Sequence, residues 1–319
     1  MVSKNVVDVI SYGLLLVLCR LNWHRVFDVW EKHGFHVTSN HFHMPIPDTR
    51  LLGDKLWKSK SELVGIKMNV TKQLELLTQV FPVYQKEYEF PRTETDTPNE
   101  YYVENGAFGS FDAEVLHCMI RHYQPKKIVE VGSGFSTLVS ANASKLNKED
   151  GVKTELFAVE PYPNVTLKKG FPGLTELIQK PVEQVDLDYF SQLGENDILF
   201  IDSSHVVKIG SDVNYLYLEV LPRLKKGVIV HVHDIFFPSE YPKGWVLSNH
   251  VFWSEQYLLQ AFLTFNYAFE VLWSSYYMHQ KYPNELKSAF PCYDSKKVTD
   301  NIHDFMFSPP ASFWFKKTV

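Results

Sequence analysis

The sequence predicts a doubly wound α/β domain, and two observations carry that prediction. Short apolar runs rich in β-branched residues recur after residue 110, and segments with helical periodicity separate them. The runs are KIVEVG (127–132), ELFAVEP (155–161), DILFID (197–202) and GVIVHVHD (227–234). Strands that are apolar along their whole length and alternate with helices form a mostly parallel sheet that is covered on both faces.

The first hundred residues follow a different pattern. Residues 1 to about 33 have helical character and end at His33-Gly34, and a second helix is expected over about 69–85. The stretch PRTETDTPNE (91–100), rich in Thr, Pro and acids, is the best linker candidate. We therefore expect a helical N-terminal extension or lid over 1–100 and the α/β domain over 101–319.

The elements of the α/β domain follow in order. Ser110 suits the N-cap of a helix with apolar residues at helical spacing. Further helical patterns are STLVSANASKL (136–146), SDVNYLYLEVLPRL (211–224) and the segment around 252–265, and weaker or later strands are LTELIQK (174–180), YAFEVLW (267–273) and SFWFKK (312–317). The last two strands lack a proper crossover helix between them, which predicts an antiparallel C-terminal hairpin at the sheet edge.

Charge and cysteine usage narrow the function. The formal net charge is -5, and no run of five or six Lys or Arg appears, so a nucleic-acid partner is not expected. Cys19, Cys118 and Cys292 are widely spaced and form no CxxC pair, which indicates neither a disulfide framework nor a zinc site. These features fit a cytoplasmic protein.

An apolar run near the start raises the question of a membrane. Residues 6–19 (VVDVISYGLLLVLC) are interrupted by Asp8 and Ser11. The run is shorter than the roughly 20 residues that a membrane span needs. We expect a helix packed on the body of the protein rather than membrane association, and an interfacial anchor is the alternative.

Acidic residues recur at one structural position. Glu130, Glu160, Asp202 and Asp234 each lie at or near the C-terminal end of a predicted strand. These ends share one edge of an open parallel sheet, where ligands bind. Because an unpaired carboxylate is costly in a core, four such acids predict a functional crevice.

Charge also helps to choose the cofactor. The turn GSGFST after the first strand permits close approach of a ligand, but Thr137 stands where a dinucleotide fingerprint has its third glycine. The pyrophosphate of a nicotinamide dinucleotide would be repelled by the acids, whereas S-adenosylmethionine brings an ammonium and a sulfonium. An NAD-dependent oxidoreductase and a non-catalytic S-adenosylmethionine-binding module are two functions that these features leave open.

Taken in order, EVGSGFST, FAVEP, DILFIDSSH and GVIVHVHD resemble the motifs of class I S-adenosylmethionine-dependent methyltransferases. The resemblance covers about 105–275 and the closing hairpin, and DSSH and HVHD resemble most the bacterial-type sugar and natural-product O-methyltransferases. It implies a Rossmann-like sheet, a catalytic domain over 101–319 and a hydroxylated small-molecule acceptor. By resemblance, the cofactor's amino-acid end would meet Glu130 and the turn residues Gly132, Ser133, Gly134 and Thr137, its ribose Glu160, and its methyl group the loop of Asp202 and Ser203.

Histidines at the strand ends are candidates for the base. Methyl transfer to a hydroxyl requires removal of a proton, and an imidazole with a pKa near neutrality suits that task. His205 is favoured over His233, and either one alternatively binds substrate. Strand alternation places His231 and His233 on one face and Asp234 on the other, with His231 as a hydrogen-bonded core residue.

Asp202 and Asp234 are also a candidate site for Mg²⁺ or another divalent cation, which would acidify the substrate hydroxyl. Metal-dependent catechol-type O-methyltransferases, which this arrangement resembles, carry an Asn after the second acid, and this chain has Ile235. Alternatively, Asp234 orients a neighbouring histidine. By resemblance, the N-terminal part and the aromatic segment FFPSEYPKGW (236–245) would cover the acceptor pocket.

Overall fold

The computed structural model describes residues 11, 13–14, 23–290, 293–301 and 308–319. They divide into two compact units, Met1–Gly53 and Asp54–Val319. Except for three positions, the apolar run 6–19 lies outside the described residues, as do Cys19 and Cys292. Cys118 is described, and it is buried and free.

From Trp23 onward the first unit has the helix α2 (Trp23–Glu31) and the short helix η1 (Thr49–Leu51), with turns and loops between them. Asp48 caps η1, because its carboxylate accepts a hydrogen bond from the Arg50 backbone N–H at 3.1 Å. Across the helices that the structure describes in both units, none combines the length and apolar character of a membrane span.

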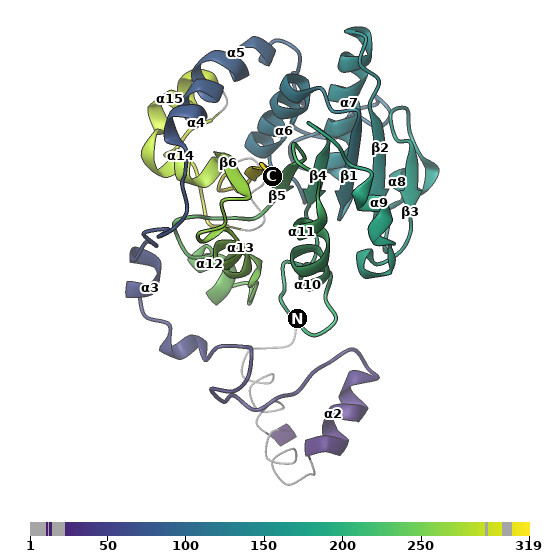
Figure 1. Ribbon diagram of the computed structural model, residues 1–319. Coiled ribbons are helices and arrows are strands. Elements are labelled where there is room, and N and C mark those ends of the chain that lie inside the picture. Colours follow the sequence, from purple (N-terminus) through teal and green to yellow (C-terminus); the bar gives the residue numbers. More distant parts are fainter. Residues whose placement is uncertain (1–10, 12, 15–22, 291–292, 302–307) are drawn as a thin grey trace. The chain divides into compact units, whose positions relative to one another are not determined.

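The second unit contains a seven-stranded sheet in the order β3-β2-β1-β4-β5-β7-β6 (Figure 1). Its strands are β1 (Lys127–Val131), β2 (Glu155–Val159), β3 (Glu176–Ile178), β4 (Ile198–Ile201), β5 (Ile229–Val232), β6 (Phe269–Ser274) and β7 (Phe313–Lys317). The first five are parallel, and β7 is antiparallel to both of its neighbours, β5 and β6. The predicted α/β class, the weak third strand and the closing antiparallel pair are confirmed.

Helices precede, separate and follow these strands. Before β1 lie α3 (Lys55–Lys58), α4 (Val70–Glu75), η2 (Leu76–Val80), α5 (Phe81–Tyr84) and α6 (Ser110–Tyr123). Between β1 and β5 lie α7 (Phe135–Glu149), α8 (Val165–Lys169), η3 (Val182–Gln184), α9 (Leu187–Ser191), α10 (Asp212–Tyr215), η4 (Leu216–Val220) and α11 (Leu221–Arg223). After β5 lie α12 (Lys243–Leu247), α13 (Glu255–Leu263), α14 (Ser275–Lys281) and α15 (Pro283–Ala289).

Two of these elements, η2 and η4, are π turns inside longer helices, and each is followed by a proline. Pro82 comes two residues after η2, and Pro222 comes two residues after η4. A proline has no backbone N–H, and its ring crowds the carbonyl four residues earlier. A wider turn relieves that crowding, so both helices continue past the proline.

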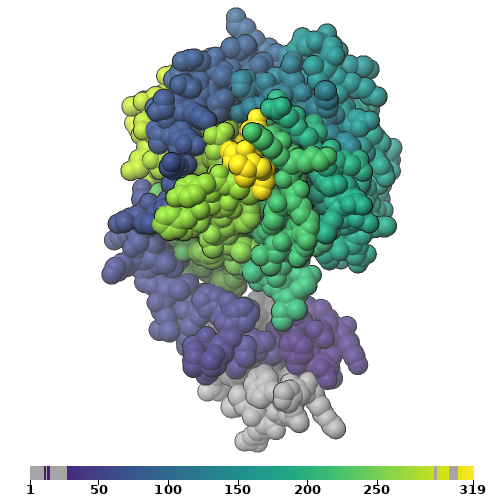
Figure 2. All heavy atoms as spheres, viewed as in Figure 1, coloured from purple at the N-terminus to yellow at the C-terminus, as the bar shows by residue number. Residues whose placement is uncertain are grey.

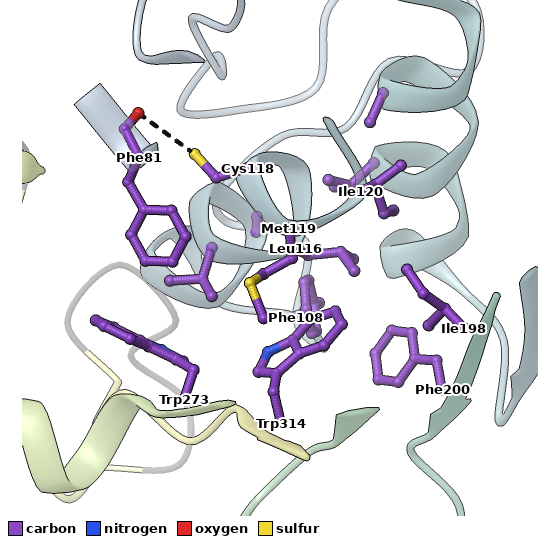
Figure 3. Close-up of a cluster of buried hydrophobic side chains, with 14 of the residues drawn as sticks. Phe81, Phe108, Leu116, Cys118, Met119, Ile120, Ile198, Phe200, Trp273 and Trp314 are labelled. Atoms are coloured by element: carbon purple, nitrogen blue, oxygen red, sulfur yellow. Dashed lines mark hydrogen bonds between the residues drawn. The ribbon is translucent and has the colours of Figure 1, made fainter. Parts of the chain in front are cut away.

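The sheet is buried on both faces, as its apolar strands require. Residues that alternate along β1 and β4 go to different cores: Ile128 and Phe200 pack with α6 and α7, while Val129 and Leu199 pack with η4 and α13. Figure 3 shows the first core, where Trp314 and Trp273 lie below α6 and the Cys118 thiol faces the Phe81 carbonyl oxygen at 3.9 Å.

The segment before residue 100 belongs partly to this second unit. Leu77 and Phe81 are fully buried, and the Phe81 ring packs edge-on against Trp273 at 5.0 Å between ring centroids. Asn69 also donates its side-chain amide to the Val271 carbonyl at 3.0 Å. The structure therefore divides after Gly53, and not near residue 100 as expected, because the predicted helix over 69–85 buries its apolar face in the domain core.

The chain ends within the sheet. β7 lies between β5 and β6, and its register with β6 shifts between Val271 and Trp273. In Figure 2 the last residues, in yellow, reach the surface, where Val319 is exposed.

Candidate active site

A crevice begins where β1 and β4 lie side by side, the point at which the strand order reverses. Gly132 follows β1 with φ +80, and a Cβ built on it would lie 1.7 Å from the backbone oxygen of Asp202. Only glycine tolerates both the left-handed conformation and that approach. The turn after β1 and the turn after β4 are thereby held in contact.

A cavity of about 390 Å³ opens beside this contact. Its lining includes the predicted Gly132, Glu160, Asp202 and Ser203, together with Asp212. Glu160 accepts hydrogen bonds from the backbone N–H groups of Ser133 (3.2 Å) and Tyr162 (2.7 Å). Sequence reasoning missed Asp212, although Ser211-Asp212 at a helix start was a usable signal.

Glu130 lies beneath the glycine turn and is not among the residues that line this cavity. Its side chain is fully buried and accepts hydrogen bonds from the hydroxyls of Ser136 (2.5 Å), Thr137 (3.0 Å) and Ser140 (3.4 Å). Burial raises the pKa of Glu130 to about 8, against the effect of the hydroxyl bonds. The residue ties β1 to α7, and its expected contact with the cofactor stays a prediction.

Gly134 and Thr137 close the same turn. The Thr137 hydroxyl accepts the Gly134 backbone N–H at 2.9 Å and donates to Glu130. The predicted turn residues thus form one hydrogen-bonded unit at the start of α7, whose first backbone N–H groups have no helical partner.

Four side chains from the ends of β4 and β5 converge beside the cavity. His233 Nδ1 lies 3.6 Å from both Asp202 Oδ1 and Asp234 Oδ2. His205 Nε2 lies 3.3 Å from the same Asp202 oxygen and 3.6 Å from the same Asp234 oxygen. The register of β4 and β5 pairs Ile201 with Val232, so Asp202 and His233 come at the same level. We call Asp202, His205, His233 and Asp234 the strand-end cluster.

Two members of this cluster have a strained backbone. His205 and Asp234 both have φ +58, in the left-handed region that side chains with a Cβ rarely adopt. Such outliers concentrate at functional sites. β5 ends at Val232, so the expected alternation does not continue to Asp234, whose carboxylate turns back toward His233.

Two further carboxylates contact the ring nitrogens of His205 and His233 that face away from the strand-end cluster. Glu255 Oε2 lies 2.8 Å from His205 Nδ1, and Asp112 Oδ2 lies 3.2 Å from His233 Nε2. Both acids are buried. Sequence reasoning missed them, because they lie on α6 and α13, 50 to 121 residues from their partners.

The carboxylates control the protonation of both imidazoles. Burial by itself lowers the pKa of His205, but the bonds to Asp202 and Glu255 outweigh it and raise that pKa to about 10. Burial likewise opposes protonation of His233, and the charges of Asp234 and Asp202 raise its pKa well above the usual value. Burial raises the pKa of Asp202, but His233 and His205 bring it down below its ordinary range.

A second, smaller cavity of about 190 Å³ adjoins the other side of the cluster. Its lining includes Asp112, His233, Asp234, Trp245 and Trp253. The Trp253 ring packs at 4.3 Å from the His205 ring and at 5.5 Å from Trp245. The strand-end cluster thus has Asp202 on the larger cavity and Asp234 on the smaller one.

The fold and this crevice define the class, and comparison with known proteins agrees. The model of a methyltransferase domain family matches residues 129–235. An uncharacterized protein from Archaeoglobus fulgidus is 37% identical over 166 residues, which cover 50% of this chain and 74% of that relative. The chain belongs to this family of methyltransferase-domain proteins.

The solved structures to which this chain is similar are more distant in sequence. A structure of cmcI with SAH is 14% identical over 73% of this chain and 98% of that chain, with a TM-score of 0.34. A structure of cmcI with Mg and SAM is 14% identical over 74% and 95%, with a TM-score of 0.35.

Proposed function

We propose that the protein transfers a methyl group from S-adenosylmethionine to a hydroxyl of a sugar or another hydroxylated small molecule, with His205 as the base. One observation supports this most: the strand-end cluster has Asp202 on the crevice at the topological switch point and His233 and Asp234 on a second cavity lined by Trp245 and Trp253. A cofactor and an acceptor in these two cavities would meet at the cluster.

The larger cavity suits a cationic cofactor. Glu160, Asp202 and Asp212 all line it, which favours the ammonium and sulfonium of S-adenosylmethionine over the pyrophosphate of a dinucleotide. In this proposal Glu160 accepts from the ribose hydroxyls, and the turn over 132–137 receives the amino-acid end. Asp202 and Ser203 border the methyl group.

In this proposal His205 removes the acceptor's proton. Its Nδ1 is held at 2.8 Å by the buried Glu255, so Nε2 is the nitrogen that faces the cluster. In the transfer, the acceptor oxygen forms a bond to the methyl carbon while the carbon–sulfur bond breaks. The electron pair of that bond goes to sulfur, which leaves as neutral S-adenosylhomocysteine, and the hydroxyl proton goes to Nε2.

A divalent cation fits the same cluster. Asp202, His233 and Asp234 each offer a ligand atom, and these atoms lie within 4.8 Å of one another. A cation held there would lower the pKa of the acceptor hydroxyl. Its positive charge would also oppose the carboxylates that raise the pKa of His205.

The lining of the smaller cavity supports a hydroxylated acceptor. Trp245 and Trp253 offer flat apolar faces, and Asp234 offers a hydrogen-bond acceptor for a hydroxyl group. This combination suits the apolar face and the hydroxyl edge of a sugar ring.

The first test is calorimetric titration with S-adenosylhomocysteine, in EDTA and again with excess Mg²⁺ or Mn²⁺. Micromolar binding is expected in each condition, because Glu160 and the glycine turn are not among the cation ligands. Absence of binding in all conditions, with binding of NADH instead, would overturn the proposal in favour of an oxidoreductase.

The base is tested by His205→Ala in an assay of labelled methyl transfer to a panel of glycosides and catechols. We expect turnover to fall by about 10²- to 10⁴-fold, with affinity for S-adenosylhomocysteine nearly unchanged. His122→Ala, at an exposed position on α6, is the matched control and is expected to keep full activity. Equal turnover in the two variants would remove His205 from the mechanism, and no turnover in the unaltered protein with any acceptor would favour the non-catalytic binding module.

A further inference from the structure

We propose that the cation site in the strand-end cluster takes the imidazole of His233 as a ligand and therefore selects a transition-type divalent ion, of the class of Mn²⁺, Fe²⁺, Co²⁺ or Zn²⁺, over Mg²⁺. The inference rests on the proposed function only for the site's role, since ion binding is independent of methyl transfer. It begins with geometry: His233 Nδ1 is equidistant, at 3.6 Å, from one oxygen of Asp202 and one of Asp234.

Such spacing is close to that of ligands around one ion. Neighbouring ligands at roughly 2.1 Å from an octahedral ion lie about 3 Å apart, so a small contraction of the three donors would bring them to a common centre. The left-handed backbone at Asp234 is what turns its carboxylate to this position.

The far nitrogen of His233 provides the second, independent observation. Its Nε2 lies 3.2 Å from Asp112, and the Asp112 carboxylate also accepts hydrogen bonds from the backbone N–H groups of Ala311 and Ser312, both at 3.0 Å. Because Asp112 is an acceptor fixed by two backbone donors, Nε2 carries the hydrogen. In the neutral ring, Nδ1 then presents its lone pair to the cluster, which is the arrangement of a carboxylate–histidine–metal triad.

The charge of the surroundings also calls for a cation. Four carboxylates, those of Asp112, Asp202, Asp234 and Glu255, face only two imidazoles. Two negative charges would remain even with both rings protonated, and buried charges without a partner are costly. A divalent ion supplies the missing positive charge.

The type of donor selects the ion. Mg²⁺ prefers oxygen ligands and keeps several waters, whereas imidazole suits first-row transition ions and Zn²⁺. This site has two carboxylates and one imidazole, and Asp112 already orients that imidazole. It therefore favours a first-row transition ion or Zn²⁺ over Mg²⁺. His205 is left to the acceptor, since the donor atoms within 4.8 Å of one another belong to Asp202, His233 and Asp234.

The test uses full-length, metal-free protein without cofactor, titrated separately with Mn²⁺ and Mg²⁺. We expect Mn²⁺ to bind at least about ten times more tightly than Mg²⁺. Pulsed EPR of the Mn²⁺ complex is expected to show a ¹⁴N coupling from a directly bound imidazole. Equal affinities for the two ions, or the absence of a ¹⁴N coupling, would overturn the proposal.

Variants identify the ligand. His233→Glu replaces the imidazole by an oxygen donor, so the ¹⁴N coupling should vanish and the preference should move toward Mg²⁺; His233→Asn is the substitute if that variant does not fold. His231→Phe, two residues earlier on the same face of β5, is the matched control and should keep the coupling. Loss of the coupling in His205→Gln, with its retention in His233→Glu, would show that His205 and not His233 binds the ion. That result would overturn the inference.

Failure of this inference and failure of the proposed function are distinguishable. Binding of Mn²⁺ with a ¹⁴N coupling, but no binding of S-adenosylhomocysteine, would leave the ion site and remove the methyltransferase activity. Binding of S-adenosylhomocysteine, together with Mn²⁺ coordinated by oxygen atoms alone, would leave the proposed methyl transfer and remove the imidazole-ligated ion site.

Discussion

Two histidines on one face of β5 have opposite surroundings. The His231 ring is stacked between Phe200 and Trp314, at 4.0 Å between centroids on each side. Among the described residues, neither of its nitrogens has a hydrogen-bond partner. His233, two residues later, has Asp112 on one nitrogen and faces Asp202 and Asp234 with the other. Burial is nearly the same at the two positions, since His231 is fully buried and His233 is 6% exposed.

The difference shows that neighbours, and not burial, decide what a buried imidazole does. Burial lowers the pKa of His231 well below the usual 6.5, so that ring stays neutral and acts as an aromatic spacer. The same desolvation acts on His233, but the nearby charges of Asp234 and Asp202 reverse its result. One pleat along a strand therefore separates a core residue from a candidate ligand. The expectation that His231 is a core residue is confirmed, although its expected hydrogen bond is absent.

The largest expected effect comes from removing a carboxylate that faces His233. Asp234→Asn should lower turnover by about 10³-fold or more, because it removes a carboxylate from the proposed cation site, which supplies several kcal/mol of transition-state stabilisation. Mn²⁺ binding should fall with it, while binding of S-adenosylhomocysteine stays nearly unchanged, since Asp234 does not line the larger cavity. Calorimetry and labelled methyl transfer measure the three quantities.

The control for Asp234→Asn is Asp188→Asn, at an exposed position on α9. It should leave turnover and ion binding unaltered. If Asp234→Asn kept wild-type turnover and bound Mn²⁺ normally, the charged surroundings of His233 would have only a structural role.

A smaller effect is expected from the carboxylate that orients the base. Glu255→Gln should lower kcat by about 10- to 100-fold with little change in KM, because Gln no longer fixes the Nδ1–H tautomer of His205. As a positioning residue, Glu255 should also move the pH profile of kcat, which a merely structural residue would not do. Glu255→Asp should restore part of the rate. A rise in KM alone, without a change in the profile, would contradict this role.

The smallest expected effect comes from replacing His231, the histidine with apolar surroundings. His231→Phe keeps the ring stack with Phe200 and Trp314 and removes two buried nitrogens that lack partners. We expect the free energy of unfolding at pH 7 to rise by about 1 kcal/mol, with turnover within about twofold of wild type. Urea denaturation measures the change, and a loss of stability would show that the ring nitrogens have a role in the core.

The pH dependence of the same variant sharpens the contrast. Because the folded-state pKa of His231 lies below 6.5, its contribution to stability is present above pH 6.5 and is lost as the pH falls below that value, by up to about 1.4 kcal/mol per pH unit. His231→Phe should reduce the dependence of the free energy of unfolding on pH in this acid range by the uptake of one proton, which is up to about 1.4 kcal/mol per pH unit. His117 and His279, whose pKa values burial lowers to about 4, keep part of it. An unchanged slope would mean that His231 is protonated in the folded state.

His205 has the opposite sign in metal-free protein. Its folded-state pKa is raised from 6.5 to about 10, so its contribution to stability is complete below pH 6.5 and is lost as the pH rises through about 10. Comparing unfolding in EDTA for wild type and His205→Gln measures this contribution.

Much of the fold was predictable because it follows from local patterns. Continuous apolar strands between helices indicated a parallel sheet, and the late strands without a crossover helix indicated the antiparallel pair β6 and β7. The unit boundary was not predictable in the same way. The linker-like composition at 91–100 says nothing about whether the helix over 69–85 packs on the domain core, and Phe81 does so.

The sequence by itself determined the class of sheet, the glycine turn and the acids at its edge, because strand ends of a parallel sheet must share one side. Tertiary structure alone decided that Asp112 and Glu255 stand behind the two histidines, because contacts between residues 50 to 121 positions apart depend on helix packing and leave no local pattern. It also decided that Asp234 turns toward His233, because one left-handed residue overrides strand alternation.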